Sequence, residues 1–479
     1  MLIKHTILYF LTRGGTGVVS FAAILIYSRL LTPEEYGIAS IVLSSVWLAQ
    51  AFGFRWINMS VARFIPGTTT ENRSTVMSTF AVMTIIVMML IALMVIPAMM
   101  TSTRLADYGE LVLLGGATLW LLSLSELNQE IFRSQLMPNQ YGWQSLLKVS
   151  LSLLFACLFI FAGLQTTGIL LGLIVGISIS LLIFPNPYWR EIRIKKWDRR
   201  LAAQYLSYGM PLIVTAAMGS LINNVDRILL GWLQGTEATG MFAVADDITQ
   251  QSLYLLMLIV NLAAFPLVIK AMEANSTIQV QQRLEQNIIL LLLISIPATF
   301  GIILLATNIS TVLLGNTYSP IATTIMPWIA LSTFLQGLKT FYFDLSFQLG
   351  QKTLPQIWPV LIAAVLTISL NLFWIPRWGI MGCAAATFVA YLVAAILSWY
   401  LGHRILPLPI PFREAGKICL ASLAMILSIL PISTKIGLWW LVGQIICGII
   451  VYGGSILLLN VAGVRDRVLR TITLRRNTG

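Results

Sequence analysis

Charged residues are scarce in this chain. Asp, Glu, Lys and Arg together make up 10% of its 479 residues, whereas soluble domains carry roughly 25%. Hydrophobic residues make up 58%, the mean hydropathy is +0.86, and no polar stretch is long enough to fold as a soluble domain. The sequence therefore predicts a protein that lies almost entirely within a lipid bilayer.

Cysteine and histidine are also rare, with four and two residues respectively. The cysteines stand singly in apolar segments without CxxC spacing, so neither a disulfide framework nor a metal site is indicated. His5 and His403 lie at predicted helix ends and form no catalytic constellation. No Walker sequence, HExxH, GxSxG or nucleotide-binding glycine loop occurs in a matching context. We therefore expect a transporter without a cofactor rather than an enzyme.

Long apolar runs, by contrast, are abundant. A membrane-spanning helix needs about 20 mostly apolar residues, and on that basis we expect an all-α polytopic fold with about fourteen transmembrane helices. The predicted spans are 6–30, 36–62, 75–100, 108–133, 140–163, 166–188, 204–232, 237–269, 286–312, 319–347, 354–376, 379–403, 414–433 and 437–461.

The two halves of the chain show a weak internal repeat. Residues 31–37 follow the first predicted helix much as residues 234–240 follow the seventh, and each segment is a short acidic turn that ends in Gly. Both preceding helices cross the membrane in the same direction, as parallel repeats would. In the sixth span, Gly168, Gly172 and Gly176 have GxxxG spacing, for which we favour a role in close helix packing.

The net charge of +12 indicates membrane topology rather than nucleic-acid binding, because Lys and Arg fall mainly between the apolar runs. The loops on the side of the N-terminus contain fourteen cations: Arg63, Arg73, Arg133, Arg190, Arg193, Lys195, Lys196, Arg199, Arg200, Lys270, Arg283, Lys352, Arg404 and Arg413. The opposite loops offer Arg104, Arg377 and Lys435, with Arg29 at a helix edge. We therefore expect both termini to be cytoplasmic.

Ionisable groups at membrane depth are functional candidates, because each costs at least ~2.5 kcal/mol to insert. They are Arg13, Arg55, Glu126, Glu130, Lys148, Asp226, Arg227, Asp246, Asp247 and Lys339, with Asp344 near a helix end. The four cations at positions 13, 55, 148 and 339 all lie about 10–13 Å from their predicted cytoplasmic helix ends. A cleft between the halves could gather them around an anion such as a pyrophosphate.

Other interpretations of these groups remain open. Glu126 and Glu130, one turn apart, could simply neutralise the cations within the bundle. Asp246 and Asp247 lie near the expected midplane and are candidates for coupling to H⁺ or Na⁺. Asp226 and Arg227 could instead form ion pairs with residues in the region of Asp246 and Asp247, or act in gating.

Three segments resemble one known family. Residues 28–37, with the sequence SRLLTPEEYG, resemble the turn after the first helix of bacterial polysaccharide flippases of the Wzx type. These flippases form a branch of the multidrug/oligosaccharidyl-lipid/polysaccharide (MOP) exporter superfamily, which includes the MATE transporters. Residues 53–64 are similar to the second helix of the family, and residues 224–231 to its seventh.

The resemblance implies a MATE-like architecture of two lobes around a central cavity. The first lobe would comprise residues 1–188, and a basic cytoplasmic linker at 189–203 would join it to the second lobe at 204–404. Residues 405–462 would form a peripheral hairpin and residues 463–479 a basic cytoplasmic tail. The cationic cavity of the family would correspond to Arg13, Arg55 and Lys148. The second lobe would be less cationic, because Tyr208 stands beside Gly209 where Arg13 stands beside Gly14.

By the same resemblance, the cargo would be an undecaprenyl-pyrophosphate-linked oligosaccharide, such as an O-antigen, capsule or exopolysaccharide repeat unit. It would move from the cytoplasmic to the periplasmic leaflet of the bacterial inner membrane by alternating access, and a polymerase and a chain-length regulator would be partners. A MATE-like drug/cation antiporter is the main alternative, although it favours acidic cavity residues. An O-antigen polymerase or ligase is a second one, and would need a larger external loop than any predicted here.

Overall fold

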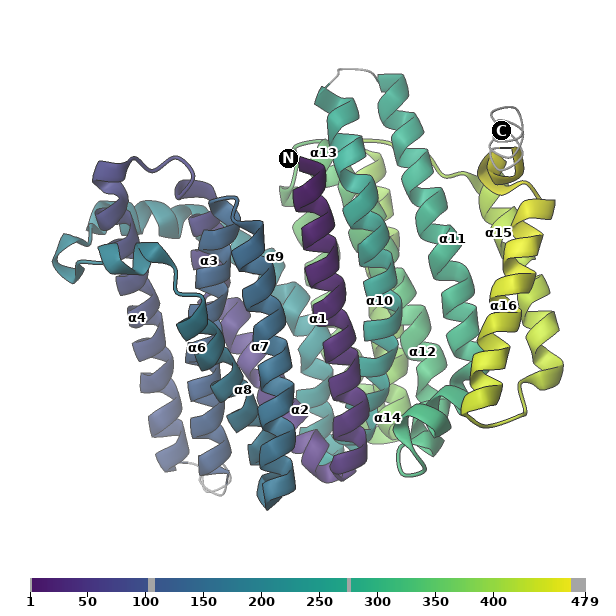
Figure 1. Cartoon of the computed structure of the whole chain (residues 1–479), viewed down its shortest axis with the longest axis horizontal. Coiled ribbons are helices and arrows are strands. Elements are labelled where there is room, and N and C mark those ends of the chain that lie inside the picture. Colours follow the sequence, from purple (N-terminus) through teal and green to yellow (C-terminus); the bar gives the residue numbers. More distant parts are fainter. Residues whose placement is uncertain (1, 102–107, 274–276, 467–479) are drawn as a thin grey trace, which may run out of the picture. The chain divides into compact units, whose positions relative to one another are not determined.

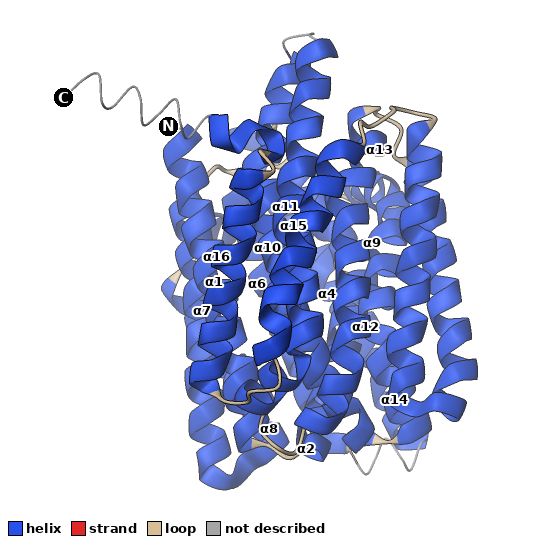
Figure 2. Cartoon of the chain, turned by 90° about the vertical axis from the view of Figure 1, so that its right-hand side faces the viewer, coloured by secondary structure: helices blue, strands red, loops and turns tan. Residues whose placement is uncertain are grey.

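The computed structural model describes residues 2–101, 108–273 and 277–466. This part of the chain is almost entirely helical and contains no strand (Figure 2), which confirms the predicted all-α polytopic fold class. The main helices are α1 Leu2–Leu30, α2 Pro33–Gly53, α3 Arg55–Phe64, α4 Thr70–Thr101, α6 Gly109–Ser134, α7 Pro138–Phe159, α8 Gln165–Ile183 and α9 Arg199–Gln234 (Figure 1). They continue with α10 Thr236–Glu273, α11 Thr277–Ile309, α12 Ser319–Leu338, α13 Leu345–Leu349, α14 Ile357–His403, α15 Phe412–Ile429 and α16 Leu438–Leu458.

Ten helical runs among the described residues are long and apolar enough to cross a membrane. Two of them, Pro138–Ile183 and Leu354–His403, contain 46 and 50 residues. A straight helix of that length would measure about 70 Å, more than twice the ~30 Å hydrocarbon core. Each run contains a glycine with positive φ, Gly163 at 90° and Gly379 at 56°, where the chain breaks into two helices. Helices therefore cover all fourteen predicted spans, and the number of crossings stays a prediction.

The glycines of the sixth predicted span pack α8 against α7, as expected (Figure 1). A Cβ atom at Gly168 would lie 3.0 Å from the backbone nitrogen of Ile160. Cβ atoms at Gly172 and Gly176 would collide with the α7 backbone one and two turns further along. As the residue numbers rise on α8 they fall on α7, so the two helices are antiparallel and their backbones touch over three turns.

The acidic turn before α2 is a helix-capping motif. The Oγ1 atom of Thr32 accepts a hydrogen bond of 3.3 Å from the backbone N–H of Glu35, and the Oε2 atom of Glu35 accepts one of 2.8 Å from the backbone N–H of Thr32. Pro33 occupies the first helical position, where its missing N–H costs nothing. The motif that carries the family resemblance thus fixes where α2 begins.

The two copies of this turn contact each other. A Cβ atom at Gly37 would collide with the carbonyl oxygen of Thr236, and a Cβ atom at Gly240 would collide with that of Pro33. The contact is reciprocal, since each glycine faces the residue four positions before the other glycine. Such an arrangement is typical of a local two-fold axis, and it gives the weak sequence repeat a structural counterpart.

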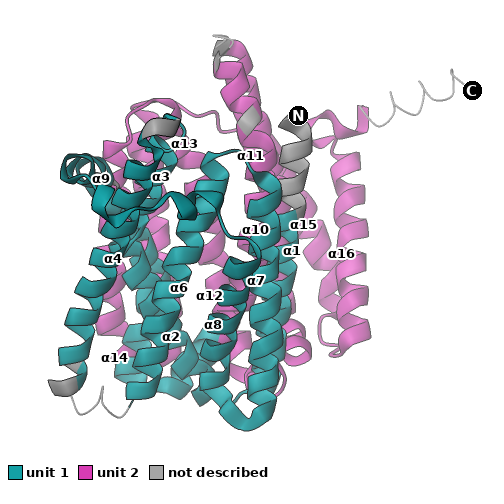
Figure 3. Ribbon diagram, turned by 60° about the vertical axis from the view of Figure 1, so that its left-hand side comes forward, with its two compact units in different colours: residues 1–243 teal, residues 244–479 magenta. Residues whose placement is uncertain are grey.

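The chain divides into two compact units, residues 1–243 and residues 244–479 (Figure 3). In the first unit, α3, α4, α6 and α9 enclose an apolar core, in which the rings of Phe80 and Tyr205 stack with centroids 4.5 Å apart. The predicted lobe boundary at residues 189–203 is a different division, and it stays a prediction.

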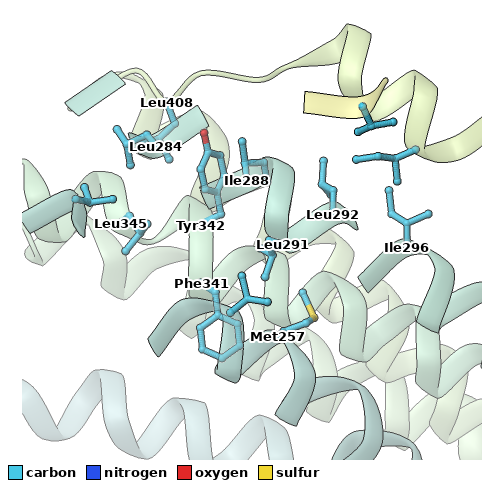
Figure 4. Packing of buried hydrophobic residues seen from close by; sticks show 14 of the residues in the cluster. Met257, Leu284, Ile288, Leu291, Leu292, Ile296, Phe341, Tyr342, Leu345 and Leu408 are labelled. Carbon is cyan, nitrogen blue, oxygen red and sulfur yellow. The ribbon is translucent and has the colours of Figure 1, made fainter. Parts of the chain in front are cut away.

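The core of the second unit joins α10, α11, η5 (Lys339–Phe343) and the hairpin of α15 and α16 (Figure 4). The hydroxyl of Tyr342 donates a hydrogen bond to the carbonyl of Pro409. Asn308 Nδ2 on α11 donates to Gln444 Oε1 on α16 at 2.7 Å, and the hydroxyl of Tyr452 on α16 donates to the carbonyl of Leu293 on α11. Buried polar bonds as well as apolar contacts thus hold the hairpin to α11.

Candidate functional site

Arg55 lies directly after a break between the helices α2 and α3. Phe54 is 2% exposed and separates α2 from α3 with φ −117° and ψ −20°. Its backbone N–H still donates to the carbonyl of Gln50 at 2.9 Å, so the chain bends without losing that bond. Arg55 begins α3 and its side chain is exposed. The sequence predicted one uninterrupted span at residues 36–62, because the apolar run continues through the break.

Glu126 on α6 is the acidic centre of the candidate site. Its Oε2 atom accepts hydrogen bonds from the side-chain amides of Gln50 and Asn58, the latter at 3.2 Å. Lys148 on α7 and Arg55 both attract this carboxylate electrostatically, and Glu130 repels it. The structure therefore brings together Arg55, Glu126 and Lys148, three of the predicted site residues, within the first unit.

Neither cation is tied to the carboxylate by an ion pair in the described part of the chain. The amides of Gln50 and Asn58 occupy the Oε2 atom, while the guanidinium of Arg55 and the ammonium of Lys148 stay nearby. Counted at their ordinary charges, Arg55 and Lys148 outnumber Glu126 by two to one, and the nearby Glu130 is paired with Arg133. Such a cluster can bind an anion, to which Arg offers forked donors and Lys a point charge.

The backbone of Arg13 belongs to α1, and its side chain lies outside the described part of the structure. Helix α1 packs against α7, the helix of Lys148, with Thr12 beside Gly142. A Cβ atom at Gly15 would lie 3.3 Å from the Cδ1 atom of Leu146. The helix that carries Arg13 is thus a neighbour of the cluster, and the part of Arg13 in binding stays a prediction.

Glu130 forms an ion pair within its own helix. Its Oε1 atom accepts from Arg133 Nη2 at 2.6 Å and from Arg133 Nε at 3.1 Å. Glu130, the second of the two glutamates that could neutralise the membrane cations, is thus paired locally with Arg133 on α6.

Lys339 lies in a buried ion pair of the second unit. Its Nζ atom is 2.7 Å from Asp344 Oδ2, and the two side chains are 8% and 5% exposed. Asp344 also accepts from Gln356 Nε2 at 3.1 Å and from the hydroxyl of Ser398. The pair contributes little net charge, so a substrate-binding role for Lys339 stays a prediction with weaker support than that of Arg55 and Lys148.

The motif at residues 224–231 packs α9 against α2. Arg227 Nη1 donates to the hydroxyl of Ser40 at 3.2 Å, and a Cβ atom at Gly231 would collide with Ile41. Asp226 is 4% exposed. These contacts are within the first unit, and the predicted gating role of the Asp–Arg pair stays untested.

The two aspartates proposed for ion coupling lie next to each other on α10. Asp246 is 6% exposed and accepts from Gln250 Nε2 at 2.9 Å, one turn further along. Asp247 is half-buried. Their role in coupling stays a prediction.

Gln50 and Asn58 were missed by sequence reasoning, although both hold Glu126. They lie on either side of the bend at Phe54, Gln50 on α2 and Asn58 on α3, and both are buried at 3% and 7% exposure. A search for neutral amides within the predicted span 36–62 would have found them.

Comparisons with known proteins give a family, a relative and several structural neighbours. Residues 2–272 match the family described as "Polysaccharide biosynthesis protein". A probable low-salt glycan biosynthesis flippase, Agl15 of Haloferax volcanii, is 22% identical over 272 residues, which is 56% of each chain. The chain thus aligns with about half the length of this relative.

Among solved structures, the lipid II flippase MurJ in an inward closed conformation has a TM-score of 0.78 at 16% identity, over 96% of this chain and 100% of that one. An inward-facing MATE-family multidrug transporter of the MOP superfamily has a TM-score of 0.67 at 14% identity, over 81% and 94% of the two chains. At these identities the likeness establishes the fold.

Proposed function

Because the chain belongs to the polysaccharide biosynthesis protein family, we propose that it is a flippase for a lipid-linked oligosaccharide. The cargo would be an undecaprenyl-pyrophosphate-linked repeat unit, moved from the cytoplasmic to the periplasmic leaflet of the bacterial inner membrane. The MOP-type fold, which the sequence resemblance predicted, supports alternating access as the mechanism. A polymerase and a chain-length regulator are the partners that we expect to act on the exported unit.

One observation carries the proposal at the level of chemistry. Arg55 and Lys148 lie beside Glu126, yet the carboxylate oxygen is hydrogen-bonded to neutral amides. Among the described residues neither cation forms an ion pair with this carboxylate, and the ligand that the two together would suit is a pyrophosphate group at membrane depth. A drug/cation antiporter would favour the opposite balance of charge.

The test is to follow lipid-linked repeat units in a strain that lacks the gene. We expect these units to accumulate in the cytoplasmic leaflet, protected from an impermeant oxidant added outside, and re-expression of the chain should make them accessible. Accumulation of unpolymerised units in the outer leaflet would favour a polymerase instead. Normal units together with impaired drug efflux would favour an antiporter.

For the energy source we propose that Asp246 and Asp247 couple cargo movement to H⁺ or Na⁺. Asp246→Asn should lower flipping in proteoliposomes with an imposed ion gradient to the rate seen without one, while binding of the cargo is unchanged. If the variant still responds fully to both gradients, Asp246 has no part in coupling.

A further inference from the structure

Six cations are concentrated in the segment of residues 187–200, which we call the basic strap. They are Arg190, Arg193, Lys195, Lys196, Arg199 and Arg200, and all six side chains are exposed. In the described part of the chain none of them forms an ion pair.

The two acidic residues of the strap form no ion pair with its six cations in the described part of the chain. Glu191 pairs with Arg73 on α4 at 3.4 Å. Asp198 caps α9, since its Oδ1 atom accepts from the backbone N–H groups of Arg200 and Leu201 at 2.6 and 3.3 Å. The exposed face of the strap is therefore strongly positive.

The strap packs against α4 (Figure 1), and hydroxyl groups of that helix fix it in place. The hydroxyl of Ser74 donates to the carbonyl of Glu191 at 2.8 Å. Ser78 accepts from the backbone N–H of Arg193 at 2.8 Å, and Thr79 accepts from that of Asp198 at 3.1 Å. Because the backbone of the strap is already ordered, binding of a ligand does not cost the conformational entropy of ordering it.

Apolar side chains are exposed among the cations. Ile194 and Trp197 are 65% and 42% exposed, and the strap directly joins α8 to α9. Trp189 is held by a hydrogen bond of 2.7 Å from its Nε1 atom to Asn128 Oδ1. Aromatic and basic residues together are typical of the membrane–water interface, whereas a surface for a soluble anion would not need exposed Ile and Trp.

We propose that the basic strap binds headgroups of anionic phospholipids in the leaflet next to it. The cations attract the phosphates while Ile194 and Trp197 enter the boundary with the acyl chains. Each cation near an anionic surface contributes roughly fivefold to such binding. Binding of the surrounding lipid by the strap does not depend on the cargo.

The experiment compares four forms of the purified full-length chain in a neutral detergent: the wild type, a strap variant, a control variant and a charge-preserving variant. The strap variant is Arg193→Gln/Lys195→Gln/Lys196→Gln, and the control is Arg283→Gln/Lys352→Gln/Arg413→Gln, which removes three exposed cations from other predicted cytoplasmic loops. Phosphatidylglycerol, but not phosphatidylcholine, should raise the unfolding temperature of the wild type and the control. The strap variant should lose at least half of this shift, and a charge-preserving Arg193→Lys/Lys195→Arg/Lys196→Arg variant should retain it.

Equal phosphatidylglycerol shifts in the strap variant and the wild type would overturn the proposal. So would an equal loss in the control, which would indicate general charge attraction, or full replacement of the lipid by inorganic pyrophosphate, which would indicate a site for a free anion. A second measurement needs no variant. Photoactivatable phosphatidylglycerol should cross-link to residues 187–200 of the wild type, and cross-links elsewhere alone would contradict the inference.

Discussion

At the scale of single residues, the membrane cations of the two units differ in how they are compensated. Lys339 has its own carboxylate at 2.7 Å inside a buried network. Arg55 and Lys148 are both attracted electrostatically by Glu126, whose Oε2 atom accepts hydrogen bonds from the amides of Gln50 and Asn58. The first arrangement suits structure and the second suits binding, so substitutions in the two places should have different consequences.

Arg55→Gln should impair export of the lipid-linked repeat unit while leaving the amount of membrane-inserted protein unchanged. A charge-assisted hydrogen bond is worth about 1.5–3 kcal/mol, so we expect transport at limiting cargo to fall roughly 10- to 100-fold. Arg63→Gln is the matched control, because it is an exposed arginine near the other end of α3. Transport by the control should stay within about twofold of the wild type, because an exposed surface charge contributes little free energy. Unaltered export by the Arg55 variant would leave this residue with a purely structural role.

Asp344→Asn should destabilise the protein rather than specifically block transport. It leaves the buried ammonium of Lys339 without its counter-charge, which costs about 3–5 kcal/mol in comparable pairs. Thermal unfolding of the purified protein should show the loss, and the double variant Lys339→Met/Asp344→Leu should recover much of it. A double variant no more stable than the single one would show that the pair is not the source of the effect.

Spacing along a helix predicts which side chains lie at membrane depth, and that assignment stays a prediction. The sequence could not predict which acid faces which cation, since that depends on the rotation of each helix and on the bend at Phe54. For the same reason the amides of Gln50 and Asn58 escaped notice, although they position Glu126.

At the scale of helices, the GxxxG spacing of the glycines in α8 correctly predicted close helix packing. The small residues of α8 predicted a close neighbour because only a missing Cβ lets two backbones touch. That the neighbour is α7 could not be read from the spacing, and it follows from the chain reversal at Gly163.

Gly172→Ala should therefore destabilise the hairpin of α7 and α8. Its Cβ atom would collide with the backbone of Ala156, which cannot move without displacing α7, and overpacking of this kind costs about 1–3 kcal/mol. Gly116→Ala on α6 is the control, because a Cβ atom there meets nothing within 4 Å. The control should be neutral or up to about 1 kcal/mol more stable, since alanine favours the helix. Equal unfolding temperatures for the two variants would contradict the close contact.

At the scale of the whole molecule, composition and apolar runs were enough to predict the fold class, because a bilayer admits so few architectures. The breaks within the two long helical runs fall at ends of predicted spans: Gly163 is the last residue of the span 140–163, and Gly379 is the first residue of the span 379–403. The division into residues 1–243 and 244–479 was not predicted. It depends on which helices pack together, and the pattern of apolar runs carries no information about that.

The orientation of the molecule is set by the distribution of Lys and Arg, and it can be tested with reporters. Six cations lie between residues 190 and 200, whereas the turn between α15 and α16 contains Lys435 alone. Because loops rich in Lys and Arg stay cytoplasmic, a fluorescent protein fused after Lys196 or after residue 466 should be fluorescent. Alkaline phosphatase fused after Lys435 should be active, since that enzyme folds only outside the cytoplasm. Phosphatase activity of a fusion after Lys196 would invert the topology and, with it, the proposed direction of transport.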